Sequence, residues 1–160
     1  MSSADISPIV ARMVTLIEGI PDIGRVIDHE VWDRDDFGPQ LISVIDGAPV
    51  MRAWLITGPT LADSAYYSQS FPANAIMRAW QYRIIGIEGL DPDASLATAT
   101  QRDQLVAVLD VLDADRQMGG SAHRSEVARV DVGPQIRKVA ERYACSYVEI
   151  TKVIVTLSSP

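Results

Sequence analysis

The alternation of apolar and polar positions predicts two β-strands that carry the same tetrapeptide, Met-Arg-Ala-Trp, in residues 51–56 and 77–88. Both runs are rich in β-branched and aromatic residues and are bounded by Gly, Pro or Asn, which is typical of strands. Residues 147–157 predict a final strand, and residues 24–32 and 126–132 fit shorter ones.

Helical spacing appears in four other segments. Ser7 and Pro8 suit the start of a first helix, whose apolar stripe is Ile9, Met13, Leu16, Ile17 and Ile20. Residues 37–45 and 134–144 are spaced like short helices. Thr98 followed by Gln101 matches a capping box ahead of the stripe Leu105, Val108, Leu109 and Leu112.

These elements predict one α/β (α+β) domain over residues 1–160, with a mostly antiparallel central sheet flanked by helices. The final strand and the second Met-Arg-Ala-Trp strand are apolar on both faces. A sheet with helices on one side needs only one apolar face, so the second face needs further helices or another subunit as a cover.

The connection between the two Met-Arg-Ala-Trp strands is long for a hairpin. We expect a loop or arm at about residues 58–75, and its aromatic residues Tyr66, Tyr67 and Phe71 argue against plain disorder. An arm of this kind would pack on something, such as a neighbouring subunit.

Composition narrows the classes of partner. The chain has 160 residues and a net charge of −7, which disfavours tight wrapping of nucleic acid and binding to anionic membranes. It lacks an apolar run long enough to span a membrane. Lys138 and Lys152 are the only lysines among 14 basic residues. The excess of arginine fits protein interfaces, or codon bias in a GC-rich genome.

Candidate chemistry is sparse. His29 lies beside Asp28, Glu30 and Asp33, a set that could bind metal or supply a general base, although solvated surface residues are the favoured interpretation. We interpret His123 in the same way and Cys145 as a buried structural thiol. We expect no catalytic, cofactor or metal site, and therefore no enzyme.

A family resemblance follows from the order of elements. An amphipathic helix ends in Ile-Glu-Gly-Ile-Pro-Asp-Ile-Gly-Arg-Val and leads into an acidic segment and a Trp-bearing strand. A long loop, a longer strand, a Thr-Gln-Arg-Asp-Gln-Leu helix and a final strand follow. Over residues 6–157 this resembles the tail terminator and tail-completion proteins of long-tailed bacteriophages, although residues 120–143 are longer than in the shortest members.

The resemblance implies a virion protein, assembled in the host cytoplasm, whose homo-oligomeric ring is commonly a hexamer. Such a ring caps the tail tube protein, joins the neck or connector proteins and allows passive contact with DNA in its lumen. It places residues 58–74 and 120–125 as reaching loops. The candidate subunit or tube interface is Arg52, Arg78, Arg83, Tyr66, Tyr67 and Phe71.

Alternatives remain at two levels. The repeated tetrapeptide either places Trp54 and Trp80 together on the core face of neighbouring strands, or makes Arg52 and Arg78 paired charges at a ring interface. The protein could be another neck component, such as a stopper, adaptor or head-completion protein. It could also be a small cytoplasmic α/β enzyme or ligand-binding domain that uses His29 with Asp28 or Glu30.

Overall fold

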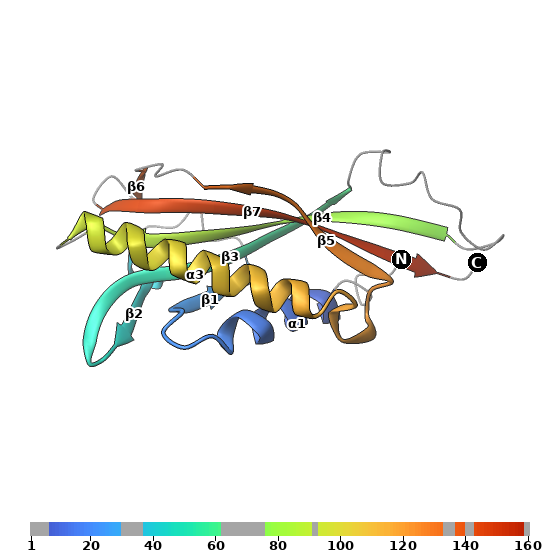
Figure 1. The fold of residues 1–160 in the computed structure, drawn as a ribbon, viewed down its shortest axis with the longest axis horizontal. Coiled ribbons are helices and arrows are strands. Elements are labelled where there is room, and N and C mark those ends of the chain that lie inside the picture. Colours follow the sequence, from blue (N-terminus) through green and yellow to red (C-terminus); the bar gives the residue numbers. More distant parts are fainter. Residues whose placement is uncertain are drawn as a thin grey trace.

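The computed structural model describes residues 7–29, 37–61, 76–90, 93–132, 137–139 and 143–158. They form a mixed α/β domain with a mostly antiparallel sheet, as predicted. The strands follow the order β1-β3-β4-β7-β5, β2 pairs with β3, and β6 pairs with β7. The helices α1 and α3 lie against one face of this long sheet (Figure 1).

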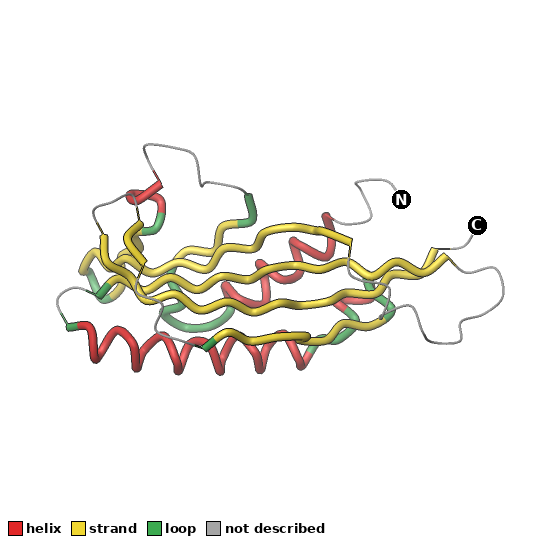
Figure 2. Tube along the Cα trace, turned by 90° about the horizontal axis from the view of Figure 1, so that it is seen from above, coloured by secondary structure: helices red, strands yellow, loops and turns green. Residues whose placement is uncertain are grey.

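The centre of the sheet consists of its three longest strands. These are β3 (Ala48–Leu61), β4 (Ile76–Gly89) and β7 (Tyr143–Ser158). The antiparallel pairing of β4 with β7 runs from Ile76 opposite Ser158 to Gly89 opposite Cys145. Figure 2 shows these two strands continuing beyond the ends of the helices.

Shorter strands complete both edges. Strand β1 (Arg25–Ile27) pairs in parallel with β3, while β2 (Ile42–Ile45) pairs antiparallel with the start of β3. On the far side, β5 (Arg124–Asp131) and β6 (Arg137–Val139) both pair with β7. Of the strands predicted at residues 24–32 and 126–132, residues 25–27 and 126–131 are confirmed, while residues 30–32 lie outside the described residues.

The main core lies between the sheet and the two long helices. Helix α1 (Ser7–Glu18) buries Ile9, Met13 and Ile17, and α3 (Ala94–Ala114) buries Leu105, Val108 and Leu112. They pack on Trp54, Tyr82, Ile84 and Ile150 of the sheet. The two predicted apolar stripes thus face the sheet, with Leu16, Ile20 and Leu109 only partly buried.

The second face of the sheet is also apolar, but it is interrupted. One buried cluster contains Leu55, Ile85 and Ile87, and another contains Ala79, Val153 and Val155. Between them lies the polar pair Arg83 and Glu149. Because both clusters are already buried within one chain, the two-faced pattern does not by itself require a second subunit.

Residues 37–45 do not form the predicted helix. Only Phe37–Gln40 is helical (α2), and residues 42–45 are strand β2. Asp46 and Gly47 have φ angles of 51° and 78°, the left-handed pair that a tight two-residue hairpin turn requires. This turn and the β-branched residues after Leu41 favour a hairpin over a helix.

The described part of residues 134–144 also contradicts the helical prediction, while residues 134–136 and 140–142 lie outside the described residues. Residues 137–139 form β6, and Tyr143 and Ala144 begin β7, with Lys138 opposite Ala144. The hydrogen bonds that β7 offers along its edge outweigh the helical spacing of the apolar residues here. In addition, β5 begins at Arg124, so the expected loop at 120–125 is shorter.

Helix α3 starts earlier than its expected capping box. Asp93 is the N-cap, and its carboxylate accepts from the backbone N–H of Ser95 at 2.9 Å and of Leu96 at 3.1 Å. Thr98 therefore lies inside the helix. Asp supplies the same acceptor as Ser or Thr at this position, which explains the displaced boundary.

The two Met-Arg-Ala-Trp segments lie on neighbouring strands but not beside each other. Trp54 is opposite Gly86, and Trp80 is opposite Leu61. The placement of both Trp side chains on the core face is confirmed, since both pack with the helix-covered core, but the two do not form a cross-strand pair. The Trp54 ring instead lies over Gly86, where an added Cβ would be 2.8 Å from Trp54 Cη2 and from Val148 Cγ2.

Replacing Gly86 with Ala should lower the free energy of unfolding by about 1–3 kcal/mol, because the added methyl group overpacks the site between Trp54 and Val148. Chemical denaturation measures the change. The matched control is Gly19→Ala, whose Cβ would lie 3.5 Å from its nearest neighbours, the carbonyl oxygens of Leu16 and Thr15. Equal effects of the two substitutions would contradict the close packing of Trp54 on Gly86.

Candidate assembly surfaces

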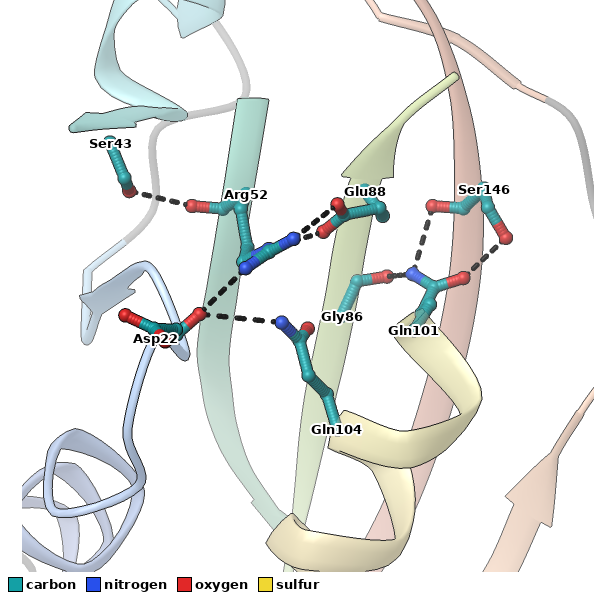
Figure 3. A network of polar contacts seen from close by, with 8 residues as sticks. All are labelled: Asp22, Ser43, Arg52, Gly86, Glu88, Gln101, Gln104 and Ser146. Atoms are coloured by element: carbon teal, nitrogen blue, oxygen red, sulfur yellow. Dashed lines mark hydrogen bonds and ion pairs between the residues drawn. The ribbon is translucent and has the colours of Figure 1, made fainter. Parts of the chain in front are cut away.

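A buried ion pair joins β3 to β4 at one end of the sheet. Arg52 donates from Nε to Glu88 Oε2 and from Nη2 to Oε1, both at 2.8 Å (Figure 3). The side chains are only 12% and 4% exposed. The strands place the two residues directly opposite each other, so the guanidinium fork meets the carboxylate with both prongs.

The same guanidinium holds the turn between α1 and β1. Arg52 Nη1 donates to the carbonyl oxygen of Asp22 at 2.9 Å, and Gln104 Nε2 of α3 donates to that oxygen at 3.4 Å. Asp22 has a φ of 56°, and Gly24 has a φ of 86° where a Cβ would lie 2.4 Å from the Arg52 carbonyl oxygen. Only glycine fits such an approach, so this turn is pressed directly onto β3.

Two opposing effects act on the pKa of Glu88 in this ion pair. Burial raises the pKa of Glu88, and the hydrogen bond and charge of Arg52 lower it in part. The hydrogen bond to Glu88 raises the pKa of Arg52. The two-pronged contact of the guanidinium with both carboxylate oxygens favours the ionised form of the pair.

A buried amide extends the polar network to β7. Gln101 Nε2 donates to the carbonyl oxygens of Gly86 and Ser146, both at 3.0 Å, and the Ser146 hydroxyl donates to Gln101 Oε1 (Figure 3). The side chain of Gln101 thereby fixes α3 across β4 and β7. The expected capping role of Gln101 is replaced by this sheet contact.

Arg83 is paired on the opposite face of the sheet. Its Nε and Nη2 donate to the two carboxylate oxygens of Glu149 at 2.6 and 2.7 Å, and Tyr147 Oη donates to Glu149 at 2.9 Å. The hydrogen bond to Glu149 raises the pKa of Arg83. The Arg83 side chain is 52% exposed, so it remains accessible to a neighbouring protein.

Arg78 lies near the far end of the β4–β7 pair. It is opposite Thr156, whose hydroxyl accepts from Trp80 Nε1 at 3.1 Å. Arg78 has no ion pair within the described part of the chain. Ten positions of β4 separate it from Glu88, the partner of Arg52, so Arg52 and Arg78 are not paired within one chain.

The predicted interface residues therefore differ in availability. Arg52 forms a buried ion pair within the chain, and Arg83 forms a half-exposed one. Arg78 forms no ion pair among the described residues. Tyr66, Tyr67 and Phe71 lie outside the described residues. The predicted arm at 58–75 also starts late, because Thr60 and Leu61 continue β3 after a bulge and pair with Gln81 and Trp80.

The alternative catalytic candidates are dispersed. His29 is exposed, with Nδ1 3.3 Å from Asp28 Oδ1, while Glu30 and Asp33 lie outside the described residues. Cys145 is buried in β7, as predicted. In the ranges that the structure describes, no group of His, Cys, Asp and Glu could hold a metal, and no helix is long and apolar enough to cross a membrane.

Lys152 is a buried cation that the sequence analysis did not single out. It is fully buried under the C-terminal part of α3, where Nζ donates to the Leu112 carbonyl oxygen at 3.2 Å. Burial lowers the pKa of Lys152 to about 8, against the attraction of Asp113. Tyr82 is opposite Lys152, its hydroxyl has no partner among the described residues, and burial raises its pKa.

No protein-family model fits the chain, and no curated protein is significantly similar to it. A functional proposal therefore rests on the residues and geometry described above.

Replacing Arg52 with Ala should lower the free energy of unfolding by about 3–5 kcal/mol at neutral pH, since Glu88 would stay buried without a counter-charge. Arg83→Ala is the matched control and should cost at most about 1 kcal/mol, because that pair is half-exposed. The Arg52→Ala penalty should fade as the pH falls, because burial raises the pKa of Glu88 and the unpaired carboxylate of the folded variant takes up a proton before that of the unfolded chain does. Denaturation at several pH values tests both, and similar costs for the two variants would contradict the assignment.

Lys152→Met should change how stability depends on pH. The pKa of Lys152 is about 8 when folded and 10.5 when unfolded, so the unfolded chain binds more protons between those values. The wild type should therefore gain about 3 kcal/mol relative to Lys152→Met as pH rises from 8 to 10.5. Parallel stability curves for the two proteins across that window would show that Lys152 is not desolvated.

Proposed function

We propose that the chain is a structural subunit of a tailed bacteriophage, a tail terminator that forms a ring at the head-proximal end of the tail. In this role it caps the tail tube and joins it to the neck. The observation that carries the proposal is the fold: an N-terminal helix, a long antiparallel strand pair, a second helix across the same face, and a final central strand. This step from fold to role is an analogy.

The shape of the sheet supports assembly into a ring. The sheet is long and open, with β1 and β2 at one edge and β5 at the other, so its two edges differ (Figure 2). Two different surfaces at opposite edges suit head-to-tail contacts, which close into a ring when the rotation allows. We propose a homo-oligomer, a hexamer by analogy, with the tube and neck proteins as further partners.

The charge of the chain fits a conduit for DNA. A net charge of −7 repels phosphate, so DNA in the lumen would slide past with only passive contact. The outward side of α3 carries the exposed carboxylates Asp103, Asp110 and Asp113, an acidic face of this kind. The virion tail is then the site of function, after assembly in the host cytoplasm.

The native mass of the purified protein, measured by light scattering with and without tail tubes, tests the proposal. We expect a ring of about six copies of the 17.5 kDa chain, or a monomer that becomes a ring on tube ends. A ring that ignores tubes would favour another neck protein, such as a stopper or adaptor. A strict monomer that never joins tubes would contradict the assembly role.

Arg78→Ala should reduce ring formation or tube binding while leaving the midpoint of unfolding nearly unchanged, because Arg78 makes no ion pair among the described residues. Exposed Arg102 on α3 supplies the matched control, Arg102→Ala, which removes the same charge elsewhere. Sedimentation of mixtures with tail tubes measures the effect. Equal assembly by the two variants would remove Arg78 from the interface.

A further inference from the structure

A groove of about 450 Å³ runs between β2 and the turn that joins α1 to β1. All four residues of β2 line one wall, and Ile20, Ile23, Glu18 and Asp22 contribute to the other. Successive residues of a strand point to opposite faces, so a groove lined by all four follows the edge of β2. β2 is the outer strand of its hairpin (Figure 1).

The backbone of β2 presents hydrogen-bonding groups to this groove. Ile45 and Ala48 flank the two-residue turn and form a hydrogen-bonded pair, and Arg52 N donates to Leu41 O at 2.9 Å. Such pairs alternate along an antiparallel ladder, so the N–H and C=O of Ile42 and Val44 point away from β3. Pro49 has no N–H and lies opposite Val44, which is consistent with Val44 and Pro49 forming a pair without hydrogen bonds between the two strands.

The edge of β2 lacks the features that prevent strand addition. Proteins protect free edges with charges, prolines or bulges. β5, at the opposite edge of the sheet, has a bulge between Val127 and Arg129 and an exposed ion pair of Arg129 with Asp131. β2 reads Ile-Ser-Val-Ile without charge or bulge, and Val44 is 76% exposed. No described strand pairs with this edge.

The charges around the groove indicate which kind of segment would bind. Glu18 and Asp22 line it together with Arg25, so carboxylates outnumber cations. The chain as a whole carries −7, which disfavours a second copy relative to a basic partner. Arg52 holds the Asp22 carbonyl from behind, so the wall that carries Asp22 is fixed in place before anything binds.

We propose that the groove binds an extended segment of a basic partner protein, which adds as a strand to the free edge of β2. Its backbone would bond to Ile42 and Val44, its aliphatic side chains would pack against Ile20 and Ile23, and a Lys or Arg would face Glu18 and Asp22. This inference goes beyond the tail-terminator role and does not depend on it.

Two labelled octapeptides test the proposal, both alternating Val with Thr, one with two central Lys residues and the other with two central Glu residues. We expect saturable binding of the Lys peptide in fluorescence anisotropy, slower exchange of the Ile42 and Val44 amides, and binding of the Glu peptide at least about tenfold weaker. Failure of the Lys peptide to bind, or equal binding of the two, would overturn the proposal.

Matched variants locate the bound strand. Val44→Pro removes one outward N–H without removing a bond to β3 and should weaken the Lys peptide about tenfold, whereas Val44→Thr keeps the N–H and should bind nearly as wild type. Equal affinities of these variants would place the peptide elsewhere. The wild type could instead self-assemble and bind no peptide, with Val44→Pro dissociating that assembly. A second copy of the chain would then be the occupant of the groove, and the proposal would be overturned.

A second pair of variants tests the charge and does not depend on how Val44→Pro folds. Glu18→Gln with Asp22→Asn removes the two groove carboxylates, and Asp103→Asn with Asp110→Asn removes the same charge from the exposed side of α3. We expect only the groove variant to weaken the Lys peptide substantially at low salt. Equal loss in both would show attraction to overall charge and would overturn the assigned site.

Discussion

The ion pair of Arg52 with Glu88 is the constraint on which the arrangement of this domain depends. One guanidinium joins β3 to β4 and also holds the turn that follows α1. Burying two charges is expensive, and the pair compensates only in good two-pronged geometry. Arg52 makes all of these hydrogen bonds only when the register of β3 with β4 and the approach of the turn are both correct. Gln104 of α3 donates to the same Asp22 carbonyl oxygen.

The groove beside β2 follows from that constraint. Arg52 fixes the Asp22 carbonyl, and Gly24 allows the turn to press against β3, so one wall of the groove is rigid. Ser43 donates to the Arg52 carbonyl oxygen at 2.9 Å and ties the opposite wall to the same residue. A single arginine thus supports both walls, while the outer backbone edge of β2 stays free of pairing with any described strand.

Periodicity in the sequence predicted the elements whose side chains alternate regularly. The stripe of α1, the Leu105–Leu112 stripe of α3 and the two faces of β4 and β7 all follow from spacing alone. Spacing predicted the wrong element where hydrogen bonds to a distant segment determine the structure. Strand β6, for example, pairs with β7 although its apolar residues are spaced as in a helix. The β2 hairpin had a usable signal in Asp46-Gly47, the turn pair most typical of two-residue hairpins.

The polar sites were harder to predict than the fold. Arg52 was predicted to lie at an interface, because nothing in its local sequence shows that Glu88 lies directly opposite it on the neighbouring strand β4. Lys152 was noted only as one of two lysines, because its burial depends on α3, whose Leu112 lies 40 positions away in the sequence. The environments of Arg52 and Lys152 both depend on how segments far apart in the sequence align with each other. A single sequence shows no local pattern from which that alignment can be predicted.

The most direct measurement is the coupling free energy of a double-mutant cycle with Arg52→Met, Glu88→Leu and the double variant, taken from denaturation at neutral pH. We expect each single change to be costly and the double variant to recover much of the loss, with a coupling free energy of at least about 2 kcal/mol. Additive effects of the two substitutions would show that Arg52 and Glu88 act independently, and would contradict the organising role of the pair.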